Sequence, residues 1–252
     1  MRLRKRASYP RGVCPAGRRY AMKRQLYLLE KALAPWPRRQ APLLEINCGN
    51  GAFLEFLWQC GFDVQGTETD PSLREKAAGA QVPGLEIFAA ADDDLPFEND
   101  SFDWVILHLK APDSMETNIA EGTRLARRGF MLTFWNSSSF PALCWRSWNK
   151  KEWAPCSAPW KKAWELMRAM EMGRLASLST LALPGCMWRD PWPGGAMSMF
   201  GVSLGAWCIM RLDMGASRPV TPQPLRLDAT LSPPAQAVME YTQKSSETVK
   251  KP

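Results

Sequence analysis

A stretch beginning at residue 43 places an acidic side chain beside glycines, a combination suited to holding a nucleotide-like ligand. The sequence Leu-Leu-Glu-Ile at residues 43–46 predicts a short strand. Gly49 and Gly51 follow, and because neither has a Cβ the backbone can turn sharply and approach a ligand closely. Residues 52–60 have apolar side chains at helical spacing. A strand, a glycine turn and a helix N-terminus together predict a site for the polar part of a nucleotide-like ligand.

A second acid follows at the distance expected for ribose recognition. Residues 62–68 predict a second strand that ends at Glu68, seventeen residues after Gly51. In doubly wound folds a carboxylate about 20 residues after the glycine turn binds the ribose hydroxyl groups. The third glycine of the dinucleotide fingerprint is replaced by Leu54, which disfavours a dehydrogenase. No Lys-Ser or Lys-Thr pair follows the glycines, so a phosphate-binding P-loop is disfavoured as well.

Four stretches in this order resemble the class I S-adenosylmethionine-dependent methyltransferases, in particular the type 11 methyltransferase-domain family. The sequence Glu-Ile-Asn-Cys-Gly-Asn-Gly at residues 45–51 is similar to the first motif of that family. Residues 66–71 resemble the end of its second strand, and residues 92–107 its adenine-side loop and fourth strand. Residues 124–132 resemble the turn before its fifth strand. The resemblance implies a Rossmann-like fold, S-adenosyl-L-methionine as cofactor and methyl transfer as reaction.

The same resemblance implies which residues bind the cofactor. They are Glu45, Asn47, Cys48, Gly49, Gly51, Glu68, Thr69, Asp92, Asp93 and Leu107. Two positions depart from the family pattern. Asn47 replaces a usual glycine, and asparagine tolerates unusual backbone dihedrals better than most residues. Ala91 falls where some relatives have aspartate, and Asp92 follows it.

His108 is the candidate catalytic residue, since it is the only histidine and directly follows the fourth predicted strand. Two roles are open to it: general base for a hydroxyl or amine acceptor, or a loop residue that packs over the cofactor. Cys48 has no paired base in the sequence around it, which disfavours a nucleophilic role. No Asn-Pro-Pro-Tyr type motif follows Leu107, which argues against amino groups of nucleic-acid bases as acceptors.

The charge is concentrated in the N-terminal residues. The chain has 252 residues and a net charge of +7, and residues 1–40 alone carry twelve Lys or Arg against one acid, Glu30. A basic arm can bind RNA by neutralising phosphates, or it can be a solvated extension. Nucleic acid is therefore a possible partner, although a small molecule is the favoured acceptor.

The cysteine pattern predicts a cytoplasmic protein without a metal site. Seven scattered cysteines contain no Cys-x-x-Cys pair, as expected for reduced thiols used as small apolar residues. There is no apolar run of eighteen residues and no signal-peptide core, so no membrane association is expected. The oligomeric state is not indicated by the sequence.

Alternating strands and helices up to residue 134 predict an α/β fold with a mostly parallel sheet covered by helices on both faces. The family resemblance implies seven strands in the order 3-2-1-4-5-7-6. We expect a basic, disordered arm at residues 1–19, a methyltransferase domain at 20–213 and a disordered tail at 214–252. Residues 136–203 are expected to elaborate the substrate side. Local patterns predict helices at residues 20–33, 71–78, 115–125 and 160–172, strands at 175–183 and 204–212, and an active-site loop or small cap at 184–203.

Nine of the twelve tryptophans lie between residues 135 and 207. They can fill the core, line a pocket for an apolar or planar molecule, or stack on nucleobases. The sequence thus predicts methyl transfer to a small molecule. Two alternatives remain: a catalytically inactive cofactor-binding partner protein, and an RNA methyltransferase that uses the basic arm.

Overall fold

The computed structural model describes residues 9–10, 13–38, 41–148, 156–189 and 204–214. In chain order, its elements are α1 Pro15–Leu33, β1 Pro42–Ile46, α2 Leu54–Gln59, β2 Asp63–Thr67, α3 Pro71–Ala78, β3 Ile87–Phe88, β4 Phe102–His108, α4 Met115–Leu125, β5 Ala126–Asn136, α5 Phe140–Trp148, β6 Ser157–Ala158, α6 Trp160–Ala169, β7 Gly173–Thr180, a 3-10 turn Gly185–Met187 and β8 Trp207–Met214.

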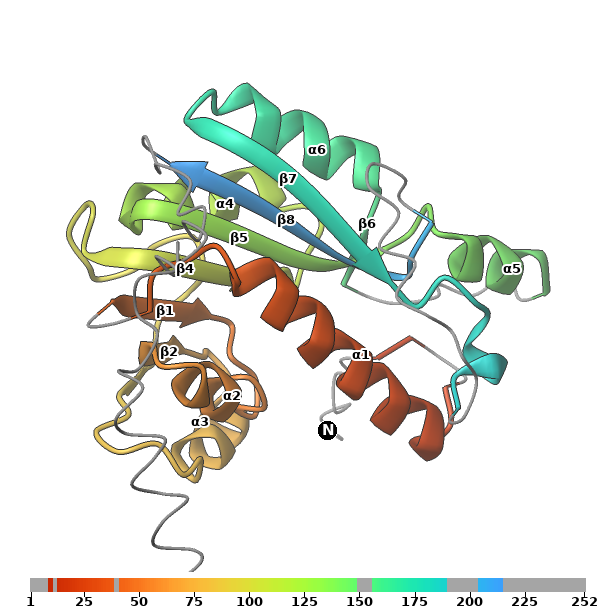
Figure 1. Cartoon of the computed structure of the whole chain (residues 1–252), viewed down its shortest axis with the longest axis horizontal. Helices are drawn as coiled ribbons and strands as arrows, with labels where there is room; N and C mark the ends of the chain where they lie inside the picture. The colour runs from red at the N-terminus through yellow and green to blue at the C-terminus, as the bar shows by residue number, and fades with distance from the viewer. Residues whose placement is uncertain (1–8, 11–12, 39–40, 149–155, 190–203, 215–252) are drawn as a thin grey trace, which may run out of the picture. The chain divides into compact units, whose positions relative to one another are not determined.

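The strands form one sheet in the order β3-β2-β1-β4-β5-β8-β7, as Figure 1 shows. Strands β1 to β5 run parallel, and β8 pairs antiparallel with both β5 and β7. The predicted order is confirmed, apart from one strand that was not expected. The two-residue strand β6 pairs with the end of β5. Because β6 was not expected, the predicted strands 6 and 7 correspond to β7 and β8.

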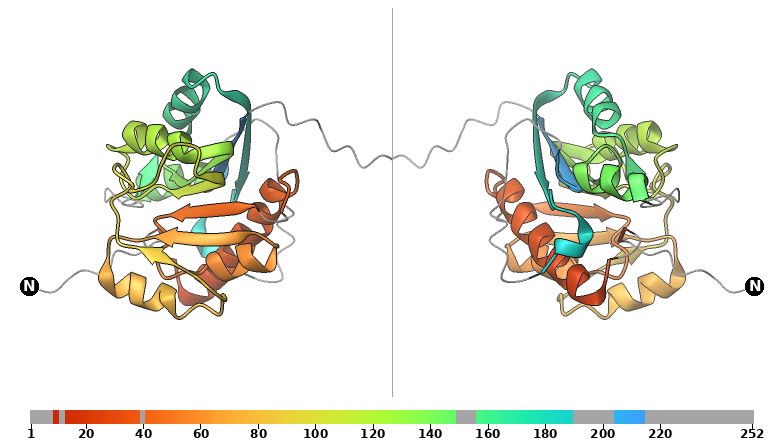
Figure 2. Two further views of the ribbon diagram at one scale, coloured as in Figure 1. Left: turned by 90° about the vertical axis from the view of Figure 1, so that its left-hand side faces the viewer. Right: turned by 90° about the vertical axis from the view of Figure 1, so that its right-hand side faces the viewer.

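Successive residues of the central strands point to opposite faces, and each face has its own core. Leu43 belongs to the cluster beneath α1 and α2, whereas Leu44 belongs to the cluster beneath α4 and α6. Both side chains are fully buried. A strand covered on both faces consists almost entirely of apolar residues, which explains the short apolar runs in the sequence. Figure 2 shows the helices on the two sides of the sheet.

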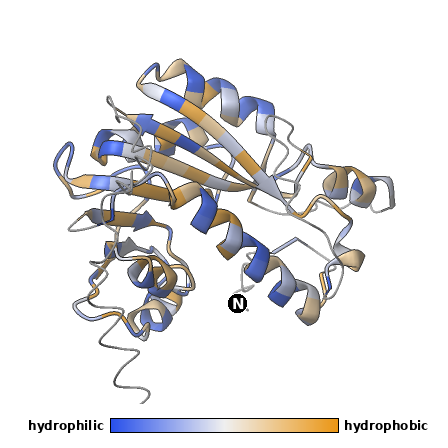
Figure 3. Cartoon of the chain, viewed as in Figure 1, coloured by the Kyte–Doolittle hydropathy of each residue, from blue (hydrophilic) through white to orange (hydrophobic). Residues whose placement is uncertain are grey.

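Helix α1 begins at Pro15, five residues before the expected start and inside the segment predicted to be a disordered arm. The Cys14 side chain accepts a hydrogen bond from the Gly17 N–H, and proline suits the first helical position. Buried Leu28, Leu29 and Leu33 lie on the inner side of α1. Hydrophilic and hydrophobic residues alternate along α1 and α6, as expected for helices with one buried face (Figure 3).

The second half of the chain differs most from the predicted elements. Helix α5 was not predicted, while α6 starts at the expected Trp160. Strands β7 and β8 start within two or three residues of their predicted starts. Most of the expected active-site loop at residues 184–203 lies outside the described residues, and so does all of the tail after Met214. Within the described segments, no helix is both long and apolar enough to cross a membrane.

Candidate functional site

The candidate site lies at the carboxyl ends of the parallel strands. The chain runs outward from β1 to β2 and β3, then crosses back to β4 on the other side of β1. Ligands of open α/β sheets bind at this reversal point, in the crevice between the ends of the two central strands. Predicted cofactor-binding residues follow β1 and β2 directly, and Leu107 lies near the end of β4, so the fold brings most of them to one edge.

The turn after β1 adopts the left-handed backbone that the glycines predicted. Asn47, Gly49 and Gly51 have φ values of 63°, 62° and 77°. A Cβ placed on Gly49 would meet nothing within 4 Å, so this side of the turn is open. A Cβ on Gly51 would lie 2.9 Å from the Ala77 Cα, so Gly51 lets the turn pack against α3. Only Gly49 therefore faces space that a ligand can enter.

Glu68 lies beside that open turn, but its carboxylate is fully buried and already bonded. Its Oε2 accepts a hydrogen bond from the Gly49 N–H at 2.9 Å. Its Oε1 accepts one from the Asp70 N–H at 2.9 Å and also contacts the Lys110 Nζ at 2.6 Å. The carboxylate that was expected to bind ribose is thus held over the glycine turn by groups of the protein itself.

Lys110 is a site residue that the sequence reasoning missed. It follows β4 by two residues, and its side chain is partly exposed. The sequence signal that could have identified Lys110 is a basic residue just after β4, combined with the acid Glu68 just after β2. Sequence spacing alone does not show that these two ends lie within reach of each other.

The Asn47 side chain connects three segments at the edge of the crevice. Its Nδ2 donates to the Asp92 Oδ2 at 2.8 Å and to the His108 carbonyl at 3.0 Å. The Asn118 Nδ2, from α4, donates to the same Asp92 oxygen at 3.0 Å, while the buried Asn118 Oδ1 has no hydrogen-bond partner. Asn47 therefore replaces glycine with a side chain that fixes Asp92 and joins the ends of β1 and β4.

His108 is fixed by both of its ring nitrogens. Its Nε2 lies 2.7 Å from the Glu45 Oε1, and its Nδ1 lies 2.6 Å from the Thr133 Oγ1. The Phe53 ring stacks on the imidazole at a centroid distance of 5.1 Å. Glu45 is fully buried, and its other oxygen, Oε2, has no hydrogen-bond partner among the described residues. The structure thus brings together Glu45 and His108, which the sequence predicted separately, with Thr133 and Phe53 as additional partners of His108.

The remaining predicted residues lie in different environments. Cys48 is buried against Gly66, and burial, with Glu45 and Glu68 nearby, raises the pKa of its thiol above the ordinary value. A neutral buried thiol is a poor nucleophile, as the sequence reasoning expected. The Leu107 side chain packs in the core on the α4 side. Thr69 and Asp93 are exposed beside the crevice, and the Thr69 hydroxyl lies 3.4 Å from the Glu68 Oε1.

Helix α2 begins later than expected. It starts at Leu54, whereas helical spacing predicted a start near residue 52, and it spans six residues. Its N-terminus therefore does not directly follow the glycine turn. The backbone N–H groups of the turn donate within the protein: those of Asn47 and Cys48 to Thr67, and that of Gly49 to Glu68.

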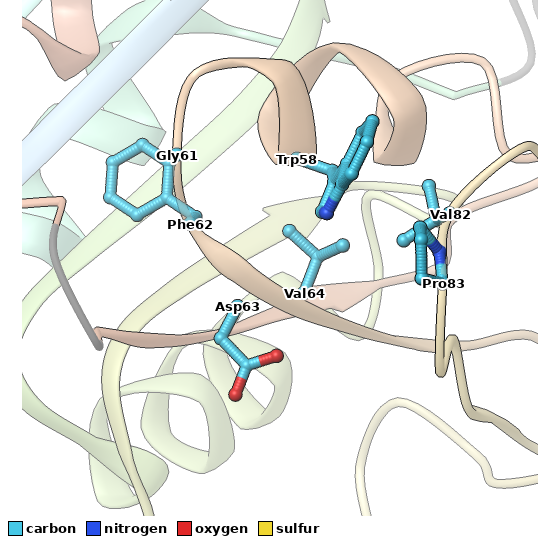
Figure 4. A pocket seen from close by; sticks show the side chains of 7 residues that line it. All are labelled: Trp58, Gly61, Phe62, Asp63, Val64, Val82 and Pro83. Carbon is cyan, nitrogen blue, oxygen red and sulfur yellow. The ribbon is translucent and has the colours of Figure 1, made fainter.

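A separate hollow of about 280 Å³ lies at the other end of β2 (Figure 4). Trp58, Phe62, Asp63 and Val64 line it, and they belong to or flank the start of that strand. Glu68 follows the opposite end of β2, so this hollow is distinct from the candidate site.

The comparisons with known proteins agree with this arrangement. Residues 44–132 match the model of a family described as "Methyltransferase domain". This stretch of the chain is therefore similar to a methyltransferase domain. The matched residues include all the strand ends that form the site, from β1 to β4. No curated protein sequence matches the chain.

Solved structures of methyltransferases share the fold of this domain. A Thermotoga maritima methyltransferase, described as a possible histamine N-methyltransferase, is 17% identical with a TM-score of 0.63 and covers 79% of this chain and 92% of its own. Magnesium protoporphyrin IX methyltransferase from Synechocystis, with S-adenosylhomocysteine bound, is 12% identical with a TM-score of 0.57. The match covers 79% of this chain and 84% of that one. A structure of the Haloferax volcanii Trm112 activator in complex with a putative methyltransferase is 17% identical with a TM-score of 0.55, and the match covers 79% of this chain and 93% of that one.

Proposed function

We propose that the protein transfers a methyl group from S-adenosylmethionine to a small-molecule acceptor. The observation that carries the proposal is the meeting of an open glycine turn at Gly49 with the buried carboxylate of Glu68 at the reversal point of the sheet. This is the place where α/β sheets bind nucleosides. The residues fit the donor, because Gly49 leaves space and Glu68 is an acceptor for hydroxyl groups.

The protein's contribution to this reaction is binding, alignment and exclusion of water. The bound donor supplies an activated methyl group. Glu68 would hold the ribose, and the backbone of the turn at residues 47–49 would line the floor of the site. Alignment of two reactants can lower a barrier by about 7–11 kcal/mol, so the reaction does not require a dedicated acid or base.

His108 is better suited to a positioning role than to that of a base. Its two nitrogens are engaged by Glu45 and Thr133, and Phe53 covers one face of the ring. A base needs a nitrogen lone pair within reach of the acceptor's proton. We therefore assign to His108 the task of pairing with Glu45 and fixing the end of β4, rather than the role of a general base.

A small molecule is favoured as the acceptor for two reasons. The described tryptophans at this edge, Trp135, Trp188 and Trp207, are almost completely buried, so they fill the core and do not form an open base-stacking surface. Two proteins of the same fold are named for small-molecule acceptors, histamine in one case and magnesium protoporphyrin IX in the other.

A second candidate function is a cofactor-binding domain without turnover. One observation favours it: each acid of the crevice already has a partner inside the protein, which is His108 for Glu45, Lys110 for Glu68 and two asparagines for Asp92. An RNA methyltransferase is the third candidate. It is favoured by basic residues on α1, where the half-buried Arg24 and the exposed Lys31 flank the exposed Tyr27 ring.

Calorimetry with S-adenosylmethionine and S-adenosylhomocysteine tests the proposal. Saturable binding of both, followed by methyl transfer to a member of a small-molecule acceptor panel, is the expected result. Binding without transfer to any acceptor would favour the inactive domain. Transfer to RNA that is lost when Arg24 and Lys31 are replaced by glutamine would favour the third candidate. Absence of binding of both compounds would contradict all three.

A further inference from the structure

Lys110 and Glu68 come from strands that are not neighbours. Lys110 follows β4 and Glu68 follows β2, while β1 lies between these two strands. Adjacent strands are spaced by about 4.8 Å, so β2 and β4 lie about 10 Å apart. The lysine side chain must therefore extend past the end of β1 to place its Nζ 2.6 Å from the Glu68 Oε1. The ion pair lies across the crevice at the reversal point.

The Glu68 carboxylate already has donors in the protein, most of them on Oε1. The Asp70 N–H, the Thr69 hydroxyl and the Lys110 ammonium group all donate to Oε1, and the Gly49 N–H donates to Oε2. Glu68 is fully buried, so its charge requires partners in the protein. Ribose hydroxyl groups that arrive as donors thus compete with the ammonium group for Oε1. Lys110 is the charged partner that can leave, because its side chain is flexible and 30% exposed.

We propose that the Lys110 ammonium group occupies the place of the donor's ribose hydroxyl groups on Glu68, and thereby sets the affinity of the crevice for the methyl donor. This inference rests on the proposed function, since it assumes that Glu68 receives the donor. Binding exchanges one set of donors for another: the hydroxyl groups reach Glu68, and the lysine moves its charge into water.

The exchange has a definite thermodynamic consequence. Lys110 stabilises the empty protein through a contact that the occupied protein lacks. A ligand that binds only after a contact is released binds more weakly by the free energy of that contact. Removing the lysine raises the free energy of the empty state and leaves the occupied state nearly unchanged. Affinity for the donor should therefore increase when Lys110 is replaced.

The test compares S-adenosylhomocysteine affinities by calorimetry for the full chain and its variants. Lys110→Met is expected to bind about tenfold more tightly or better, since a hydrogen bond to a charged group no longer has to be broken. Lys110→Arg keeps a cation and should bind like the unaltered protein. Lys76→Met, at an exposed lysine on α3, is the matched control and should change nothing.

Lys110→Gln is a second variant in case Lys110→Met misfolds. The glutamine amide can still donate a hydrogen bond to Glu68, but it lacks the positive charge of the lysine. Its affinity should lie between those of the unaltered protein and Lys110→Met. Circular dichroism of each variant reports whether the fold is retained.

The outcomes separate this inference from the proposed function. If the unaltered protein binds S-adenosylhomocysteine and Lys110→Met binds it equally or more weakly, Lys110 either has no role in binding or contacts the ligand itself. That result overturns this inference and leaves the proposed function intact. If neither binds, the inference and the proposed function both fall. If only the lysine variants bind, the lysine blocks the crevice and both are supported.

Discussion

The two halves of the sheet use their buried residues differently. At the edge of β2, β1 and β4, the buried side chains are acids and amides, each with a partner from another segment. At the corresponding edge of β5 and β8, the buried side chains include the uncharged Trp135 and Trp207 beside Asn136, and Trp135 stacks with Trp188 at a centroid distance of 6.1 Å. Buried charges need partners, which a ligand can replace, whereas buried aromatic rings contribute mainly to packing.

This difference assigns separate tasks to the two halves. We expect changes on the β1 side to alter ligand affinity and changes on the β5 side to alter stability. The Phe53 ring joins the two halves, since it stacks on His108 at 5.1 Å and on Trp207 at 6.3 Å. Variants in each half that leave Phe53 intact therefore test the comparison most cleanly.

Phe134→Ala should have the largest effect, and it should act on stability. The side chain is 2% exposed in the core on the α4 side of β5. Truncating a buried phenylalanine removes about 3–5 kcal/mol from the free energy of unfolding, measured by urea denaturation. Affinity for S-adenosylhomocysteine should stay within about twofold, because distant sites act independently.

Phe140→Ala is the control for this change, since Phe140 is 49% exposed on α5. It should alter stability by less than about 0.5 kcal/mol. A folded Phe134→Ala protein that loses its affinity for the ligand would show that the two halves do not act separately.

Glu68→Gln should have the next largest effect, and it should act on affinity. An amide is a weaker acceptor for hydroxyl groups than a carboxylate, and the loss of one charged hydrogen bond costs about 1.5–3 kcal/mol. We expect S-adenosylhomocysteine to bind about 10–100-fold more weakly in calorimetry. Glu75→Gln, at an exposed acid on α3, should bind normally. Equal affinities of these two variants would remove Glu68 from the site.

The two buried thiols should have a smaller effect, which is a loss of stability at alkaline pH. Burial raises the pKa of Cys48 on the β1 side and of Cys208 on the β5 side. Both thiols stay neutral in the folded protein but ionise in the unfolded chain, so stability is unaffected below pH ~8.5 and falls above it. Each thiol should lower the free energy of unfolding by ~1.4 kcal/mol per pH unit in that range.

Urea denaturation at several values between pH 8 and pH 10 measures this slope. Cys48→Ala and Cys208→Ala should each reduce the alkaline loss by a similar amount. If one variant leaves the slope unchanged, the thiol concerned is accessible to water in the folded protein, and that half of the sheet is less tightly closed than the other.

The sequence predicted the first half of the fold well because its local signals agree with one another. Helices α3 and α4 begin and end at the predicted residues, with Pro71 at the first position of α3. The strand order followed from the family resemblance. Helix α5 was missed because a run rich in tryptophan and proline has no clear period, and β6 because a two-residue strand depends on its partner β5.

The site was predicted as a set of residues but not as a set of contacts. Glycines and acids at strand ends are visible in the sequence, and the structure gathers them at one edge. The partners that engage the acids come from elsewhere: Lys110, Asn118 and His108 lie 42, 26 and 63 residues from the acids they contact. Such pairs depend on strand order and side-chain length, which local patterns do not contain.

The most direct test of the account is a crystal structure of the protein grown with S-adenosylhomocysteine. We expect the nucleoside beside Gly49, with its ribose hydroxyl groups on Glu68 and the Lys110 side chain withdrawn. A structure at saturating ligand in which Lys110 still contacts Glu68 and the ligand lies elsewhere, or does not bind, would contradict the account.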